Sequence, residues 1–500
     1  MQVSPEFKDF APAFAAKQPV LVWTTVVSDL ETPVSAMLKL ADGRPNSFLF
    51  ESVEGGETRG RYSFIGLKPD LIWRCFGDRA ELNRRARSSP ERFEKVNSGA
   101  LASLKALIAE CRVATPADLP PMAAGLFGYL GYGTVGLIEK LPDAKPDTLG
   151  IPDGLFLRPS IVCIFDTIAD RVTVVTPVWP ESGVGADQAY EAARARLVDT
   201  LADLDRDLPQ RRESVEATQE LPPPKPNMTR EQCFAMVEKA KEYIRAGEIF
   251  QVVPSMRFRV PFKLPPLALY RALRRLNPSP FLFFLDFGNF SVVGSSPEIL
   301  VRLRGGAVTI RPLAGTRRRG RDAAEDKALA EELLADPKER AEHLMLLDLA
   351  RNDVGRVSKT GTVEVVEQFV IERYSHVMHI SSHVEGKVDP KYQALDALMA
   401  GFPAGTLSGA PKVRAMEIID ELEPERRNLY GGGIGYFAGD GSMDTCIVLR
   451  TAIVKDGQMV VQAGCGVVAD SDPAREYQEI LDKSRALFRA AEEAVKFARS

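Results

Sequence analysis

The chain has 500 residues, of which 45% are hydrophobic and 26% charged, and this composition is typical of a folded globular protein with more than one core and not of a disordered chain. The formal charge of −4 at pH 7 provides no positive field for nucleic acid or anionic lipid. No apolar run reaches the roughly 18 residues that a membrane span requires, and the N-terminus lacks the regions of a signal peptide. We therefore predict a cytoplasmic protein with no nucleic-acid partner and no membrane association.

The first part of the chain, residues 18–205, mixes strand-like runs such as VLVWTTVV with amphipathic helical runs such as GADQAYEAARARLVDTLADL. This pattern predicts an α+β region with a hairpin near its end. Residues 206–228 are rich in charge and proline and end in LPPPKPN, which favours neither element type and predicts an exposed linker.

A second unit is predicted over residues 229–487. Thr229 and Gln232 form a capping box that opens a helix, and Gly247 ends it. Beyond this helix, strand-like blocks follow one another with few helices between them and with D-G and G-D turns. The fold class we predict is α+β, with largely antiparallel sheets packed as a sandwich flanked by helices.

Two predicted helices, one starting at residue 337 and one at residue 473, begin with the same signature. In each, an aspartate in the capping position precedes a proline in the first helical position. Each helix carries two glutamates three residues apart on one face: Glu339 and Glu342 on the first, Glu476 and Glu479 on the second. Four converging carboxylates repel one another and require a cation, and ligation by oxygen alone indicates Mg²⁺. The alternative is that these acids only complement the helix dipoles.

Glycine-rich stretches gather in the second unit, at residues 312–320, 402–412, 430–437 and 463–468. None matches a phosphate-binding loop, and all could simply form turns. Glycines at this density also allow backbone N–H groups to approach an anion, and Arg450 offers a fork for a carboxylate. These residues predict a Mg²⁺-dependent site for a small substrate that carries carboxylates.

From about residue 229 to 487 the chain resembles the chorismate-utilising enzymes. The motifs that carry the resemblance occur in order: GSSPE, PLAGTR, KERAEHLMLLDLARND, HVMHISS, FPAGTLSGAPK, YGGGIGYF, DTCIVLRTA, QAGCGVVADSDP and EYQEILDKSRAL. The family includes anthranilate synthase component I, aminodeoxychorismate synthase, and isochorismate and salicylate synthases. The resemblance implies that both acid pairs serve the Mg²⁺ that holds the ring carboxylate of chorismate.

Two positions favour the anthranilate synthase component I branch of the family. Isochorismate and salicylate synthases resemble one another in having a water-activating lysine where this chain has Gln251, and aminodeoxychorismate synthases have a nucleophilic lysine where it has Ala314. The resemblance then implies a Mg²⁺-dependent lyase that converts chorismate and ammonia to anthranilate and pyruvate, the first committed step of tryptophan biosynthesis. Two alternatives stay open, an aminodeoxychorismate synthase component and an inactive tryptophan-binding sensor.

The resemblance also implies roles for individual residues. Glu342 and Glu479 are expected to bind Mg²⁺ directly, and Glu339 and Glu476 through water. The groups expected to hold the substrate's carboxylates are Gly315, Thr316, Tyr430, Arg450, Gly464, Cys465 and Gly466. His379 and Glu298 are the candidates for acid–base chemistry, with Thr406 nearby; His379 could instead be a structural strand histidine.

A tryptophan feedback site is implied by LFES and NPSPF. The residues expected to line it are Glu51, Ser52, Asn277, Pro280, Phe281 and Leu282. We expect LFES to end a strand, so that Glu51 takes the amino group of tryptophan and Ser52 its carboxylate; the alternative is that both motifs are ordinary structure. Because the chain lacks the Cys–His pair of a glutaminase, ammonia is expected from a glutamine amidotransferase subunit, in a heterotetramer of two large and two small subunits.

Overall fold

The computed structural model describes residues 1–54, 58–142, 145–208, 221–374 and 377–498. The helices in the described part of the chain are α1 (Phe7–Ala15), α2 (Pro33–Ala41), α3 (Ala100–Glu110), η1 (Pro121–Ala123), η2 (Tyr132–Leu137), α4 (Ala186–Leu204), α5 (Arg230–Arg245), α6 (Pro266–Leu276), α7 (Ala323–Ala335), α8 (Pro337–Gly355), α9 (Ala394–Gly401), η3 (Gly405–Leu407), α10 (Lys412–Leu422) and α11 (Pro473–Ala498). The η elements are short 3₁₀ helices. None of these described helices is both long enough and apolar enough to cross a membrane.

The strands come in two groups along the chain. Those before residue 230 are β1 (Val20–Val27), β2 (Ser47–Glu54), β3 (Thr58–Phe76), β4 (Arg79–Asn83), β5 (Glu94–Gly99), β6 (Gly125–Leu130), β7 (Gly154–Asp166), β8 (Arg171–Val178) and β9 (Lys225–Pro226). Those after it are β10 (Gln251–Val252), β11 (Ser255–Pro261), β12 (Phe281–Asp286), β13 (Ser291–Ser296), β14 (Ile299–Arg304), β15 (Ala307–Ile310), β16 (Leu313–Arg318), β17 (Glu364–Arg373), β18 (Val377–Lys387), β19 (Gly409–Ala410), β20 (Gly433–Ala438), β21 (Met443–Ile447), β22 (Thr451–Lys455) and β23 (Gln458–Gly464).

The predicted antiparallel α+β class is confirmed. Every pairing between named strands is antiparallel, and apart from β10 and β19 the strands form one connected system of 21 strands. Strands before and after the predicted linker pair directly: β2 with β12 and β6 with β20. The boundaries at residues 205 and 229 stay a prediction, and residues 209–220 of the predicted linker lie outside the described residues.

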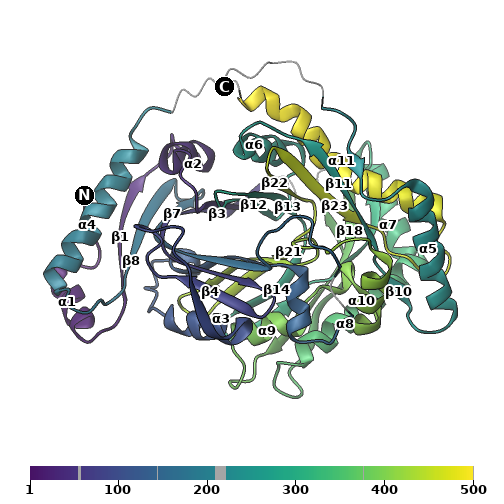
Figure 1. Cartoon of the computed structure of the whole chain (residues 1–500), viewed down its shortest axis with the longest axis horizontal. Helices are drawn as coiled ribbons and strands as arrows, with labels where there is room; N and C mark the ends of the chain where they lie inside the picture. Colours follow the sequence, from purple (N-terminus) through teal and green to yellow (C-terminus); the bar gives the residue numbers. More distant parts are fainter. Residues whose placement is uncertain (55–57, 143–144, 209–220, 375–376, 499–500) are drawn as a thin grey trace.

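Three large hydrophobic cores explain the layering. One core lies beneath α1, α2, α4, α6 and α11, and another beneath α3, α8 and α9. The third core is built from strand and loop side chains, for example Phe48 of β2, Phe127 of β6 and Phe283 of β12, and the rings of Phe48 and Phe127 stack with their centroids 4.7 Å apart. Figure 1 shows the strands in the middle of the molecule with helices around them, α1 and α4 on one side and α8, α9 and α10 on the other. This is the predicted sandwich flanked by helices.

One local expectation about β2 was wrong. LFES does not end the strand: β2 continues to Glu54, with an irregularity in the register between Glu51 and Val53, and it lies between β3 and β12. Such an irregularity turns a side chain away from the regular alternation. Ser52 therefore lies within β2, at an irregularity in its pairing with β3 and one residue beyond its last pairing with β12, and not at the end of the strand.

Candidate active site

The two acidic helices start where the sequence predicts. The carboxylate of Asp336 accepts hydrogen bonds from the backbone N–H groups of Lys338 and Glu339, at 2.9 and 3.3 Å, and α8 begins at Pro337. Asp472 accepts from the N–H of Arg475 at 3.0 Å, and α11 begins at Pro473. Both caps satisfy backbone donors that have no partner within the helix.

The four predicted metal ligands have different partners. Glu339 forms an ion pair with Arg317 at 3.0 Å, and Glu479 one with Lys483 at 2.6 Å. Glu342 Oε1 accepts a hydrogen bond from Gln251 Nε2 at 3.1 Å. Glu476 Oε2 is buried and has no hydrogen-bond partner within the described part of the chain. In the same described ranges, no three carboxylate, imidazole or thiol groups are already arranged to hold a metal ion.

The electrostatics of these acids nevertheless fit a cation. The pKa of Glu342 is raised, first by burial and then by the neighbouring carboxylates Glu339 and Glu479, while Gln251 and Lys483 oppose the shift. The pKa of Glu476 is raised by burial and by Glu479. A divalent cation would neutralise this repulsion and give Glu476 Oε2 a partner, in competition with Arg317 and Lys483. The residues present therefore fit Mg²⁺.

The acid cluster adjoins two of the glycine stretches. Gly315 has a φ of 74°, and a Cβ at this position would lie 3.1 Å from Glu339 Oε2. A Cβ on Gly466 would lie 2.8 Å from Gln251 Nε2 and 4.0 Å from Glu342 Oε1. The positive φ at Gly315 favours glycine there, and a side chain at position 466 would displace the amide of Gln251, so the backbone approaches the acid cluster closely at both positions.

His379 lies on β18 opposite Thr316. Its Nδ1 is 3.0 Å from the carbonyl oxygen of Gly315 and 3.0 Å from Thr316 Oγ1. Because a carbonyl only accepts, Nδ1 carries the proton and Nε2 keeps a free lone pair. Burial, reinforced by Arg450, lowers the pKa of His379 to about 4. The imidazole is therefore neutral at physiological pH and able to accept a proton.

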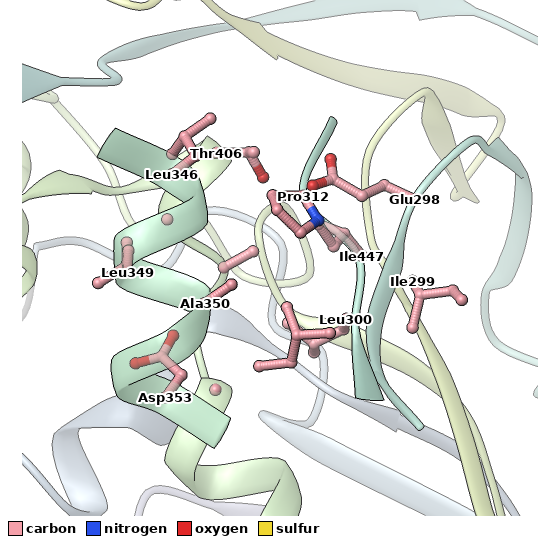
Figure 2. Close-up of a pocket in the computed structure, with 14 residues that line it drawn as sticks. Glu298, Ile299, Leu300, Pro312, Leu346, Leu349, Ala350, Asp353, Thr406 and Ile447 are labelled. Atoms are coloured by element: carbon pink, nitrogen blue, oxygen red, sulfur yellow. The ribbon is translucent and has the colours of Figure 1, made fainter. Parts of the chain in front are cut away.

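Glu298 is buried in the segment that precedes β14. Burial raises the pKa of its carboxyl to about 8, while the N–H of Leu313, the hydroxyl of Thr406 and the charge of Arg450 pull it down. A small cavity of about 30 Å³ lies between Glu298, Thr406 and α8, and both side chains point into its upper part (Figure 2). Glu298 thus holds a proton that it can donate at neutral pH.

The remaining predicted substrate residues differ in the partners that they already have within the protein. Arg450 is half-buried with a φ of 49°, and its charge interacts with the side chains of Tyr374 and Glu298. The buried hydroxyl of Tyr430 lies 2.9 Å from the position of a Cβ on Gly464. The backbone N–H of Cys465 donates to the carbonyl of Pro254 at 3.1 Å, so it is already occupied. Of these groups, Arg450 is the best suited to bind a carboxylate, because a guanidinium can donate two parallel hydrogen bonds to it.

A larger cavity, of about 870 Å³, contains five of the six predicted inhibitor residues in its wall. These are Glu51, Ser52, Pro280, Phe281 and Leu282. The sixth, Asn277, lies at the end of α6, where its carbonyl accepts a hydrogen bond from the hydroxyl of Ser295. Sequence reasoning missed part of the wall, Ile434, Gly435, Tyr436 and Asp444, because only the pairing of β20 and β21 brings these residues there. The cavity extends to Glu298, which also borders the smaller cavity.

Glu51 was expected to bind the amino group of tryptophan, but its carboxylate already has partners within the protein. Its carboxylate is buried and forms two hydrogen bonds with Arg274, from Nε at 2.6 Å and from Nη2 at 2.8 Å. The hydroxyl of Tyr270 donates to the same carboxylate at 2.5 Å. An ammonium group would therefore have to share Glu51 with Arg274, a contact between α6 and β2 that no local sequence pattern signals.

Comparison with known proteins identifies the family. Residues 48–489 match the sequence profile of the family described as chorismate binding enzyme. The chain belongs to the chorismate binding enzymes. The match begins at β2, so it covers most of the first part of the chain as well as the segment that carries the motifs.

Several chorismate binding enzymes are similar over almost their whole length. Anthranilate synthase component 1 of Cereibacter sphaeroides is 58% identical over 493 residues, covering 99% of this chain and 98% of that protein. The component 1 of Pseudomonas aeruginosa is 48% identical, covering 93% and 94%. The crystal structure of component I from Streptococcus pneumoniae superimposes with a TM-score of 0.75 at 35% identity, covering 86% of this chain and 92% of that one. The menaquinone-specific isochorismate synthase of Escherichia coli, 19% identical with a TM-score of 0.70, shares the fold.

Proposed function

We propose that this chorismate binding enzyme is component 1 of an anthranilate synthase, which converts chorismate and ammonia to anthranilate and pyruvate in the first committed step of tryptophan biosynthesis. The observation that carries the proposal is the 58% identity to a component 1 protein across 99% of the chain. The proposed activity is that of a lyase.

The residues around the acid cluster support ammonia as the nucleophile. Gln251, whose Nε2 donates to Glu342, cannot remove a proton from water, and Ala314 cannot form a covalent bond to the substrate. Because neither position supplies a base or a nucleophile, these two residues favour an attacking group that does not have to be deprotonated before it attacks. Ammonia satisfies this requirement and water does not.

The metal proposal assigns Glu342 and Glu479 as direct ligands of Mg²⁺, with Glu339 and Glu476 acting through water. When bound, Mg²⁺ would neutralise the ring carboxylate of chorismate and assist the departure of the ring hydroxyl. The raised pKa values of Glu342 and Glu476 and the unpaired Glu476 Oε2 support this assignment. Arg450, Tyr430, Thr316 and the backbone at residues 315, 464 and 466 are assigned to the carboxylates of the substrate, whereas the N–H of Cys465 already donates to Pro254.

The acid–base proposal uses the two protonation states described above. Glu298 carries a proton below a pKa of about 8 and donates it to the leaving ring hydroxyl, with Thr406 beside it. In the second step the ring becomes aromatic, so a ring proton must be removed as the enolpyruvyl C–O bond breaks. Neutral His379, with its free Nε2, is the base that we assign to this step.

The feedback proposal places tryptophan in the 870 Å³ cavity, against Ser52, Phe281 and Leu282. The aromatic and proline-fixed wall suits an indole ring, and the extension of the cavity to Glu298 gives inhibitor and substrate a shared neighbour. Inhibition then reflects a difference in tryptophan affinity between two conformations of the protein. Glutamine-derived ammonia would come from an amidotransferase subunit, in a heterotetramer of two chains of each kind.

The experiment that tests the proposed function is a fluorescence assay for anthranilate with the purified chain, chorismate, Mg²⁺ and ammonium at alkaline pH. Anthranilate should accumulate, and omission of ammonium or chelation of Mg²⁺ should stop it. If chorismate is consumed while an aminated, non-aromatic product accumulates, the chain is an aminodeoxychorismate synthase component. If tryptophan binds but no chorismate is consumed, the chain is an inactive sensor.

A further inference from the structure

Arg427 lies in the turn between α10 and β20 and is only 4% exposed. Its guanidinium forms an ion pair with the equally buried Glu423, with Nη2 2.6 Å and Nε 3.1 Å from Oε1. A buried ion pair contributes little net stability unless further hydrogen bonds satisfy it, and some such pairs instead fix one specific geometry. The other donors of Arg427 show which parts of the protein it fixes.

Those donors hold two segments of the candidate active site. Nη1 donates to the carbonyl of Leu407, which directly follows Thr406, at 2.6 Å. Nη2 donates to the carbonyl of Val253, two residues after Gln251, also at 2.6 Å. Because the guanidinium is rigid and planar, it fixes these two segments relative to each other.

Two tyrosine rings enclose the same guanidinium. The ring of Tyr430, which we assign to a substrate carboxylate, has its centroid 5.4 Å from the guanidinium carbon of Arg427. The ring of Tyr132, from η2 in the first part of the chain, lies closer, at 4.8 Å. The backbone N–H of Tyr132 also donates to the carbonyl of Asn428 at 2.8 Å. Tyr132 thereby connects the first part of the chain to the turn that carries Tyr430.

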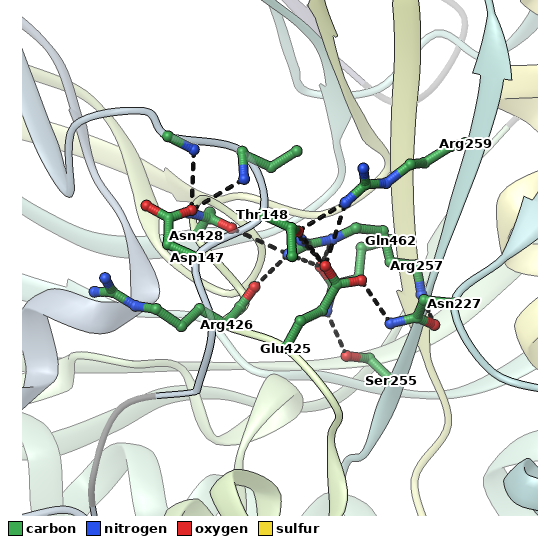
Figure 3. A network of polar contacts seen from close by, with 12 residues as sticks. Asp147, Thr148, Asn227, Ser255, Arg257, Arg259, Glu425, Arg426, Asn428 and Gln462 are labelled. Atoms are coloured by element: carbon green, nitrogen blue, oxygen red, sulfur yellow. Dashed lines mark hydrogen bonds and ion pairs between the residues drawn. The ribbon is translucent and has the colours of Figure 1, made fainter.

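A second buried arginine, Arg257 of β11, contacts the same turn at residues before and after Arg427 (Figure 3). Arg257 forms an ion pair with Glu425 at 3.0 Å and donates to Asn428 Oδ1 at 3.2 Å. It also donates to Gln462 of β23 at 3.0 Å. With residues on both sides of Arg427 held in this way, its guanidinium has a defined position from which to orient the site.

We propose that Arg427 is a positioning residue for the reaction: through Leu407, Val253 and Tyr430 it keeps three active-site segments in the arrangement that receives chorismate, with Tyr132 holding it in place. The inference rests on the proposed function, because chorismate is the ligand that these segments would receive. Arg427 acts through the residues that touch substrate and does not itself touch the reacting atoms.

The chain provides a matched control at Arg158 of β7. Arg158 is also buried, forms an ion pair with Asp70 at 2.8 Å and has the ring of Trp179 over its guanidinium at 4.5 Å. Its other partners, Glu110 and Cys111, likewise lie in the first part of the chain, far in sequence from every predicted substrate residue. The two arginines thus share their chemistry and differ in what they hold.

The test compares Arg427→Lys and Tyr132→Leu with Arg158→Lys and Trp179→Leu. Lysine keeps the positive charge but loses the fork, and leucine removes the ring over the guanidinium. For the two site variants we expect the KM for chorismate to rise about tenfold, which equals about 1.4 kcal/mol, with the KM for ammonium within twofold of wild type. Both controls should leave both KM values within twofold, even where they lower the unfolding midpoint.

Chorismate affinity is also measured by calorimetry with Mg²⁺, so that the test does not depend on turnover. If Arg427→Lys does not fold, Tyr132→Leu decides. Unchanged chorismate affinity in a folded Tyr132→Leu variant, or an equal loss in the Trp179→Leu control, would overturn the positioning role. Failure of the proposed function is a separate result, in which the wild type binds chorismate but forms no anthranilate.

Discussion

The buried carboxyl of Glu298 should make the stability of the protein depend on pH in a way that one substitution removes. The pKa of this carboxyl is about 8 in the folded protein, against an ordinary value of 4.5. Between these two pH values the unfolded chain releases the proton while the folded protein keeps it, so unfolding becomes easier as pH rises. Below pH 4.5 and above pH 8 the contribution is constant.

The magnitude follows from the pKa difference. One pKa unit corresponds to about 1.36 kcal/mol, so full titration of Glu298 lowers the free energy of unfolding by roughly 3–5 kcal/mol between pH 4.5 and pH 8. Glu298→Gln cannot titrate, so the variant should gain stability relative to wild type by that amount as pH rises. The assay is urea unfolding of both proteins, followed by intrinsic fluorescence at pH 5, 6, 7 and 8.

The comparison with wild type cancels the titration of all other groups. Glu364→Gln, at an exposed position on β17, serves as the control and should follow the wild-type curve. If the stability difference between wild type and Glu298→Gln is the same at all four pH values, Glu298 is ionised in the folded protein and cannot act as the acid. With the fold retained, Glu298→Gln should also lose most of its turnover, measured at a fixed concentration of unprotonated ammonia.

Three further predictions concern the metal, the ammonia source and the inhibitor. Glu342→Gln and Glu479→Gln should each lower Mg²⁺-dependent turnover at least about 100-fold with an unchanged circular dichroism spectrum; near-normal activity at limiting Mg²⁺ would show that these acids serve only the helix dipoles. The isolated chain should form anthranilate with ammonium and not with glutamine, and glutamine-dependent product from the chain alone would contradict the need for a partner subunit. Ser52→Phe should fill part of the 870 Å³ cavity and abolish tryptophan inhibition while activity without tryptophan is retained; equal inhibition of both proteins, or none in wild type, would place the inhibitor elsewhere.

Local features of the fold could be predicted from the sequence because they depend on a few adjacent residues. The starts of α8 and α11 follow from Asp–Pro pairs, and the start of α5 follows from the capping box of Thr229 and Gln232. The hairpin of β7 and β8 follows from two strand-like apolar runs on either side of a turn. In each case the deciding hydrogen bonds lie within a few residues of one another.

Other features depend on contacts between distant segments. Strand β3 was not predicted as one element, because Pro69 and the glycines at positions 60 and 66 interrupt the strand pattern, although its pairing with β7 from Tyr62 to Cys75 makes these residues part of one strand of 19 residues. The ion pair of Glu51 with Arg274 joins residues 223 positions apart. Tertiary pairing, which overrides local propensity, determines both.

In the candidate site, too, some features could be predicted from the sequence and others could not. The residues themselves could be named from the motifs, and the family resemblance, which the match over residues 48–489 confirms, supplied their roles. The ion pair of Glu479 with Lys483 could be read from their spacing of four residues on one helix, but no local pattern signals that Glu339 pairs with Arg317 or that Arg427 joins Leu407 to Val253. These are the contacts that a bound cation or substrate would have to displace or use.

The most direct test of the account is the ratio of pyruvate to anthranilate that the purified chain forms from chorismate with Mg²⁺ and ammonium. The account predicts one pyruvate and one anthranilate for each chorismate consumed, because the ring can become aromatic only when the enolpyruvyl group leaves. Chorismate consumption without pyruvate, or pyruvate formation without anthranilate, would contradict the proposed reaction.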